Sequence, residues 1–257
     1  MIELHEVAVT AGSKPLLQDI EVRFNVGEFS AVLGPNGVGK TTLLRAIAGL
    51  QAAARGTVTL DGRDVAHLRP GERALRVAFV TSDDALTDAL SVRDVVGIGR
   101  YAHHRWWQWR ERTDDRIAVE CALHAVGMAE LAGRPFATLS SGERQRVWIA
   151  LGLAQETPSL LLDEPTSHLD VRVAHEILAL LRGLARGGKA IVCVLHDLND
   201  AAAYADRIAL LGDGRLLCAG TPDEVFAGSA LERAYGVAME RVRSADGRLR
   251  VFARVAE

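Results

Sequence analysis

The sequence is short of cysteine, aromatic residues and net charge, and each shortage excludes a class of protein. Its 257 residues include three cysteines, Cys121, Cys193 and Cys218. Their wide spacing fits neither a CxxC metal pair nor a disulfide framework, which suits a reducing cytosol. The formal charge of −3 and the pI near 6.3 give no sign of the basic surface that nucleic-acid binding needs.

Long hydrophobic runs are also missing, and we do not expect the first residues to act as a leader. No apolar run approaches the roughly 20 residues of a membrane helix. The N-terminal residues Met1 to Glu6 do not resemble a signal peptide. We therefore expect that the chain does not move a solute across a membrane by itself.

A glycine-rich stretch carries the strongest motif that is present. Gly34 to Thr41 matches G-x-x-x-x-G-K-[ST] in full, after the apolar run Phe29–Leu33 and before a helical pattern up to Ala48. In such a strand–turn–helix unit, backbone N–H groups and the helix N-terminus form one concave phosphate site. We expect Lys40 to reach the β- and γ-phosphates, and the Thr41 hydroxyl to bind Mg²⁺. The predicted nucleotide-binding residues are Gly34, Pro35, Asn36, Gly37, Val38, Gly39, Lys40, Thr41 and Thr42.

Two further apolar runs end in polar residues. Leu160–Leu162 is followed by Asp163 and Glu164, and Ala190–Leu195 is followed by His196. In an open α/β sheet, ligands bind at the carboxyl ends of the strands. We expect Asp163 to hold Mg²⁺ through water and Glu164 to act as general base. A strand-end histidine is more often structural, but three strands directed to one edge favour a catalytic His196 beside Glu164 and Lys40.

The segment Leu139–Glu143 precedes another helical pattern, Val147–Ala154. Ser140 and Gly142 stand at the predicted helix start, where a hydroxyl and free N–H groups can bind an anion. Taken alone, an ordinary serine cap of the helix explains Ser140 equally well.

Together these motifs resemble the ATP-binding subunit of an ATP-binding-cassette (ABC) transporter. The resemblance spans essentially the whole chain, in the family's order: Walker A at 34–42, signature at 139–143, Walker B at 160–164, D-loop at 167–170 and switch histidine at His196. It implies an α/β fold, namely a P-loop NTPase of ABC type with a mixed sheet core, an N-terminal antiparallel β subdomain and an inserted helical subdomain. It also implies an ATPase, using ATP and Mg²⁺, whose hydrolysis is coupled to transmembrane transport.

The resemblance also implies partners. Two copies would sandwich two ATP molecules head to tail, with Ser140, Ser141, Gly142 and Glu143 on the nucleotide of the second copy. The homodimer would dock on transmembrane permease subunits at the cytoplasmic face of the bacterial inner membrane. A solute-binding protein would act indirectly, and no nucleic acid is expected.

Several stretches resemble importers of iron–siderophore, haem and cobalamin type. They are residues 154–160, 194–200, 203–208 and 220–225. Haem importers often carry a longer segment before Walker B, which tilts the expectation toward a siderophore or cobalamin.

Two positions depart from the family's pattern. The family's glutamine, which reaches Mg²⁺ and links the nucleotide to the permease, is matched by Ser82. Serine has a shorter reach, so a metal contact there needs a water or a loop shift, and Asp83 is an alternative. The aromatic residue that usually stacks on adenine is matched by Ala11, so we expect weak base selectivity. These departures keep an alternative open: a non-transport or regulatory ABC ATPase that binds ATP with little turnover.

We expect one ABC ATPase domain over residues 1–257. Residues of about 1–82 and 156–220 form its sheet core, about 83–155 the helical subdomain, and about 221–257 a tail with a β-hairpin. The residue pattern also predicts a turn at Asp61-Gly62 and a helix over Asp114–Val126.

Three tryptophans, Trp106, Trp107 and Trp109, stand among arginines in a chain with only 5% aromatic residues. Packing within the helical subdomain and contact with the permease are both open interpretations. Stacking on nucleic acid is a third and less favoured one.

Overall fold

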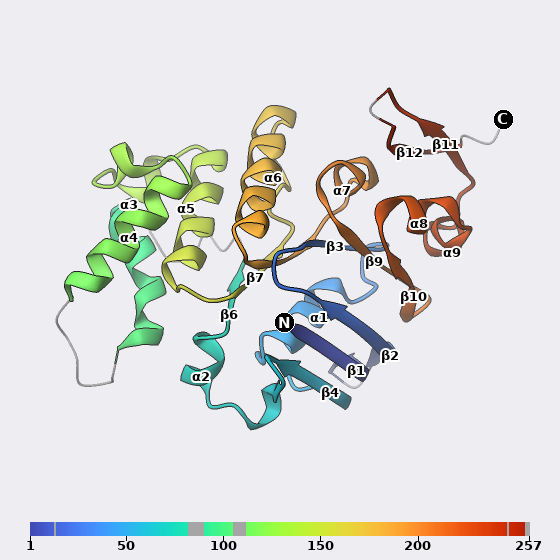
Figure 1. Ribbon diagram of the computed structural model, residues 1–257, viewed down its shortest axis with the longest axis horizontal. Coiled ribbons are helices and arrows are strands. Elements are labelled where there is room, and N and C mark those ends of the chain that lie inside the picture. Colours follow the sequence, from blue (N-terminus) through green and yellow to red (C-terminus); the bar gives the residue numbers. More distant parts are fainter. Residues whose placement is uncertain (13, 82–89, 105–111, 246, 255–257) are drawn as a thin grey trace.

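The computed structural model describes residues 1–12, 14–81, 90–104, 112–245 and 247–254. Its centre is a six-stranded sheet of order β10-β9-β3-β8-β7-β6 (Figure 1). All neighbouring strands are parallel except β10, which runs antiparallel to β9. The central strands are continuous apolar runs because both of their faces are covered. The strands span Phe29–Leu33 (β3), Val77–Val80 (β6), Ser159–Asp163 (β7), Ala190–Val194 (β8), Arg207–Gly212 (β9) and Arg215–Gly220 (β10).

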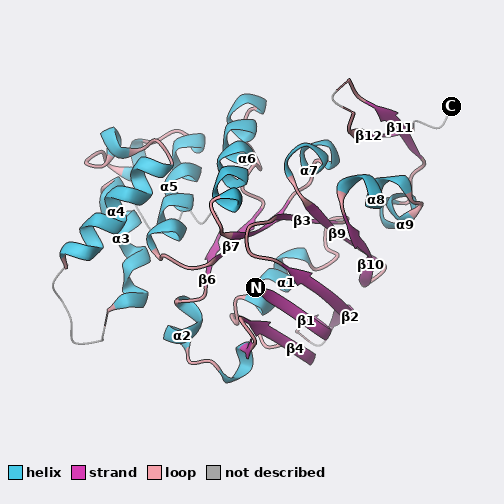
Figure 2. Cartoon of the chain, viewed as in Figure 1, coloured by secondary structure: helices cyan, strands magenta, loops and turns pink. Residues whose placement is uncertain are grey.

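A second, antiparallel sheet of order β2-β1-β4-β5 faces the first, and Figure 2 shows the two layers with helix α1 between them. Leu43, Leu44 and Ile47 of α1 share one buried cluster with side chains of both sheets. Asp61 and Gly62 both have positive φ and join β4 to β5, so the predicted turn is confirmed. The elements are β1 (Ile2–Ala11), β2 (Lys14–Phe24), α1 (Lys40–Ile47), β4 (Arg55–Leu60) and β5 (Arg63–Asp64).

Helices gather beyond strand β6 and on the outer face of the large sheet (Figure 1). The helix predicted over Asp114–Val126 is confirmed to within one residue at each end, as α4. The outer face carries α6 (Val171–Arg186) and α7 (Leu198–Tyr204). Between β5 and β7 the described residues form η1 (Val65–His67), α2 (Pro70–Ala74), α3 (Val92–Gly97), η3 (Ile98–His103), α4 (Thr113–Ala125), η4 (Ala129–Leu131), η5 (Phe136–Thr138) and α5 (Ser141–Ala154).

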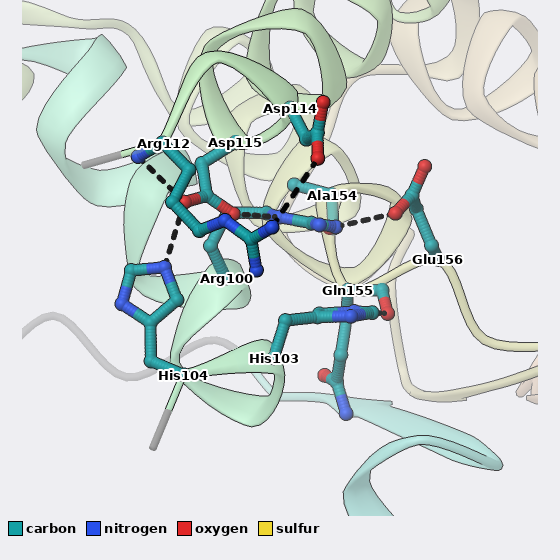
Figure 3. Close-up of polar contacts among 9 residues, drawn as sticks. All are labelled: Arg100, His103, His104, Arg112, Asp114, Asp115, Ala154, Gln155 and Glu156. Atoms are coloured by element: carbon teal, nitrogen blue, oxygen red, sulfur yellow. Dashed lines mark hydrogen bonds and ion pairs between the residues drawn. The ribbon is translucent and has the colours of Figure 1, made fainter. Parts of the chain in front are cut away.

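A buried arginine fastens this helical part to the segment that leads into strand β7 (Figure 3). Arg100 Nε donates to Asp115 Oδ1 (3.1 Å), and Arg100 Nη1 donates to the Ala154 carbonyl (2.5 Å) and to Glu156 Oε2 (2.7 Å). Burial raises the pKa of Asp115, but hydrogen bonds from the Arg112 backbone, His104 and Arg100 outweigh it and lower that pKa to about 2. Because β7 carries Asp163 at its end, this ion cluster helps to fix a strand of the candidate site.

The chain ends in two short helices and a β-hairpin. Helices α8 (Pro222–Ala227) and α9 (Ala230–Tyr235) precede strands β11 (Met239–Arg243) and β12 (Leu249–Ala253). The two strands pair antiparallel from Met239↔Ala253 to Arg243↔Leu249, so the predicted hairpin is confirmed.

Candidate nucleotide-binding site

The predicted phosphate loop joins β3 to α1 and depends on three glycines. Gly34, Gly37 and Gly39 have φ values of 147°, 77° and 109°, a backbone region that favours glycine. A Cβ on Gly34 would also lie 2.5 Å from the carbonyl oxygen of Leu211. The sequence of the loop is therefore matched to its shape, which leads the chain directly into the first turn of α1.

Lys40 lies inside this loop. Its Nζ donates hydrogen bonds to the carbonyl oxygens of Gly34 (2.8 Å) and Pro35 (3.1 Å). Burial lowers the pKa of Lys40 from its ordinary value, while the carboxylates of Glu164 and Asp163 partly oppose that fall. The arrangement holds an ammonium group at the point where a bound phosphate would need a positive charge.

Thr41 and Asp163 meet across the site. Thr41 Oγ1 donates a 3.1 Å hydrogen bond to Asp163 Oδ1, at the end of β7. Burial raises the pKa of Asp163, the hydrogen bond from Thr41 lowers it, and the neighbouring Glu164 raises it again. A hydroxyl and a carboxylate side by side are oxygen ligands of the kind that Mg²⁺ prefers.

Glu164 and His196 also pair. His196 Nε2 lies 2.7 Å from Glu164 Oε1, and both side chains are about two-fifths exposed, at 41% and 38%. Glu164 has a positive φ of 52° in a turn in which Ser167 Oγ donates to Glu164 Oε2 at 3.2 Å. The carboxylate thus has a different partner on each oxygen and still faces solvent. A partly exposed carboxylate held in this way remains within reach of a water molecule in the cleft.

Lys40, Thr41, Glu164 and His196 share one cleft with a volume of about 310 Å³, and Asp163 is hydrogen bonded to Thr41 of this cleft. It is lined by Leu16, Asn36, Gly37, Gly39, Lys40, Thr41, Thr42, Glu164 and His196. The strand order explains the convergence, because β3, β8 and β7 are neighbours in the parallel sheet and end at the same edge. Ala11 is exposed and does not line the cleft, whereas Leu16 of β2 does.

The segment around Ser140 begins helix α5 and does not line this cleft. Ser140 is the N-cap: its hydroxyl accepts from the Glu143 backbone N–H (3.4 Å), and Glu143 Oε2 accepts from the Ser140 N–H and hydroxyl (2.8 Å each). The two residues form a capping box, so the serine-cap interpretation is confirmed. Ser140 and Ser141 are exposed, which leaves this helix start accessible to another molecule.

A family model described as ABC transporter matches residues 17–167. The chain belongs to the ABC transporter family. It is accordingly an ATPase that binds ATP, and its mixed sheet, antiparallel β-sheet and helical part are the cassette fold expected from the sequence.

Two similar proteins are ATP-binding proteins of hemin import and of ferric enterobactin transport. The hemin import ATP-binding protein HmuV of Streptomyces coelicolor is 46% identical over 233 residues, which is 90% of this chain and 82% of that protein. The ferric enterobactin transport ATP-binding protein FepC of Escherichia coli is 39% identical over 228 residues, which is 88% of this chain and 83% of that protein.

Solved structures of this family superpose on the ABC cassette described here. An inward-facing metal-chelate type ABC transporter matches with a TM-score of 0.84 and 25% identity, over 99% of this chain and 97% of that one. A bacterial ABC transporter cassette solved as a dimer matches with a TM-score of 0.75 and 29% identity, over 86% of this chain and 99% of that one.

Sequence reasoning missed two residues of this ABC site. Leu16 was hidden because its strand is distant in sequence, and nothing in its neighbours marks it. Ser167 stands three residues after Glu164 in a stretch assigned to the D-loop, and a Glu-x-x-Ser turn is a local signal that could have found the contact.

Other predicted features lie outside the described residues. These are Ser82, Asp83 and the three tryptophans at 106, 107 and 109. Within the described residues of this ABC ATPase, no three His, Cys, Asp or Glu side chains gather as a metal site. Within that same part, no helix is both long and apolar enough to span a membrane.

Proposed function

We propose that this ABC ATPase is the motor subunit of a bacterial importer that takes up an iron chelate, either hemin or a ferric siderophore. These two relatives are named for hemin import and for ferric enterobactin transport, and this chain covers most of their length. These relatives favour hemin and siderophores over cobalamin as the substrate. They therefore speak against the expectation from the sequence that haem is less favoured. The subunit would work at the cytoplasmic face of the inner membrane on permease subunits, with a solute-binding protein acting upstream.

The observation that supports turnover is that Lys40, Glu164 and His196 line one cleft, with Asp163 hydrogen bonded to Thr41 of the same cleft. In this proposal the phosphate loop and Lys40 bind the β- and γ-phosphates of ATP. Glu164 takes a proton from the attacking water, and His196 orients Glu164 through the 2.7 Å contact. A degenerate cassette would have no need for a carboxylate with a partner on each oxygen, so a regulatory role is disfavoured.

Thr41 and Asp163 are the residues that would hold Mg²⁺. Their oxygens are already adjacent, and a hard cation bound by few protein ligands fills its remaining positions with phosphate and water oxygens. The ion would neutralise charge on the phosphates during hydrolysis. Ser82 stays a prediction as a third ligand.

We further propose that the active form is a head-to-tail homodimer with composite sites. The start of α5, with exposed Ser140 and Ser141 followed by the buried Gly142, is absent from the chain's own cleft. A helix start with an accessible hydroxyl suits the γ-phosphate of ATP held by a second copy. The signature residues would then complete the partner's site.

Mixing two inactive variants tests the composite site. Lys40→Ala removes the phosphate ligand, and Ser140→Asn keeps a good helix cap while removing the hydroxyl. A heterodimer of the two has one site with both defects and one intact site. We expect neither variant alone to hydrolyse ATP and an equal mixture to recover about a quarter of the wild-type sites. A mixture as inactive as its components would contradict the head-to-tail assembly.

The substrate class needs the whole transporter. With the subunit reconstituted with its permease and binding protein in vesicles, we expect hemin or a ferric siderophore to stimulate ATP hydrolysis and to accumulate inside. Cobalamin serves as the control substrate. Stimulation by cobalamin and by neither iron chelate would overturn the proposed substrate.

A further inference from the structure

The C-terminal hairpin is hydrogen bonded to the helix that follows the catalytic histidine. Asn199, in the first turn of α7, makes paired hydrogen bonds with the backbone of Val251 in β12. Its Nδ2 donates to the Val251 carbonyl (3.1 Å), and its Oδ1 accepts from the Val251 N–H (3.0 Å). Arg250 Nη1 adds a bond to the Asn199 carbonyl (2.7 Å). Three hydrogen bonds therefore tie the start of α7 to one strand.

That start is directly connected to the site. His196 lies between the end of β8 and Asp197, which caps α7 by accepting from the N–H groups of Asn199 (2.7 Å) and Asp200 (2.9 Å). With seven residues, α7 is too short to be stable without tertiary contacts. The direction in which the chain leaves His196 thus depends on what holds the first turn of α7.

The hairpin itself is firmly held. Arg241 of β11 forms a two-point ion pair with Glu232 of α9, with Nη1–Oε1 at 2.7 Å and Nη2–Oε2 at 2.9 Å. Paired bonds of this kind are strong and fix orientation. Arg241 also donates to the Phe226 carbonyl (2.6 Å), which ties β11 to α8.

Helix α9 packs against the end of β9, next to the phosphate loop. A Cβ on Gly212, at the end of β9, would lie 3.1 Å from the Cα of Ala234 in this helix. The next residue, Tyr235, has a pKa raised to about 12, because burial raises it and outweighs the opposing effect of a hydrogen bond with the Gly34 backbone. The C-terminal elements thus contact structures on two sides of the site.

We propose that Asn199 is a positioning residue for ATP hydrolysis: it couples the C-terminal hairpin to helix α7 and thereby holds His196 against Glu164. The inference rests on the proposed role of His196 in hydrolysis. It assigns to the hairpin a function in turnover, because the paired bonds to Val251 fix the first turn of the helix that directly follows the catalytic histidine.

Asn199→Ala removes the paired bonds and leaves every residue of the cleft in place. We expect kcat for ATP to fall about tenfold, since a small misplacement of a catalytic group suffices for such a loss, with KM unchanged. Arg243→Ala is the matched control. It removes hairpin contacts to Asp223 and Gly247 but none to α7, so it should keep wild-type kcat.

A double-mutant cycle separates positioning from simple anchoring. Hydrolysis is measured under single-turnover conditions with enzyme in excess, which detects slow rates, for the wild type, Asn199→Ala, His196→Ala and the double variant. If Asn199 acts through His196, Asn199→Ala causes no further loss when His196 is already absent. Melting temperatures of all the variants, including Arg243→Ala, report any general loss of stability.

The outcomes distinguish the two claims. A wild-type rate in His196→Ala would refute the proposed catalytic role of His196 itself. An impaired His196→Ala combined with wild-type kcat in Asn199→Ala would overturn only the positioning role. The same fold loss from Asn199→Ala in both backgrounds would also overturn it, because the effect would then not pass through His196.

Discussion

Thr41 Oγ1 donates a 3.1 Å hydrogen bond to Asp163 Oδ1, joining two residues that are 122 positions apart. The contact links the first turn of α1 to the end of β7. The fold alone brings the hydroxyl of the phosphate loop and the carboxylate of Walker B into contact. The oxygens that we assign to Mg²⁺ are therefore preorganised by the fold.

Removing the Thr41 hydroxyl should weaken the response to magnesium. We expect Thr41→Val to raise the Mg²⁺ concentration for half-maximal ATPase activity about tenfold, because one oxygen ligand is lost. Thr41→Ser keeps the hydroxyl and is the matched control, with little change. A magnesium titration of steady-state hydrolysis measures both, and equal behaviour of the two variants would remove Thr41 from the metal site.

The ionised side chain of Asp163 should lower the stability of the folded chain at neutral pH. Burial raises its pKa in the folded chain above the ordinary 3.8 of the unfolded chain. The folded state then disfavours the carboxylate, so this group's contribution to stability is lost as pH rises from 3.8 through the folded pKa. We expect Asp163→Asn to melt higher than wild type at pH 7 and to lose activity, with the melting difference vanishing at low pH. A variant that melts lower at pH 7 would contradict this.

We expect weak base selectivity, with Leu16 contacting either base alike. Leu16 lines the cleft and Ala11 does not, and among the described residues that line it there is no Phe, Tyr or Trp to stack on adenine. We expect GTP to be hydrolysed within about tenfold of ATP in kcat/KM. Leu16→Ala should raise KM for both nucleotides about fivefold, as expected for losing roughly 1 kcal/mol of apolar contact. A preference for ATP above a hundredfold would show that another group reads the base.

Local patterns predicted the elements that carry the site. The phosphate loop, the strand ends at Asp163 and His196, and the hairpin turn at Asp61 depend on short-range rules: glycine backbone freedom, apolar runs and turn residues. Each of these patterns is complete within about ten residues of sequence. They were enough to place three strand ends at one edge.

The side-chain partners could not be predicted in the same way. The bond of Asn199 to Val251 and the position of Leu16 depend on how distant elements pack, which no local pattern encodes. For Ser140, one chain shows the helix cap that the sequence predicted. Its proposed role at the nucleotide of a second copy depends on contacts that only a dimer contains. The predicted contact of Ser82 or Asp83 with Mg²⁺ stays a prediction.

Serine in place of the family's glutamine at position 82 should weaken the coupling of ATP hydrolysis to the permease more than it lowers the basal rate of hydrolysis. Thr41 and Asp163 still supply metal ligands, so we expect Ser82→Gln to raise the substrate-stimulated to basal ATPase ratio in the reconstituted transporter, with little change in basal rate. Asp83→Ala is the companion variant. If it uncouples while Ser82→Gln is silent, Asp83 has taken over the contact and the weakened link is wrong.

Glu164→Gln tests the central claim most directly. The substitution keeps size and removes the base, and His196 still lies beside it. Steady-state hydrolysis is measured together with the mass in solution by light scattering, with and without ATP. We predict that hydrolysis falls about a hundredfold or more while ATP binds and holds two copies together as a dimer. Wild-type turnover, or a monomer with ATP bound, would contradict the account.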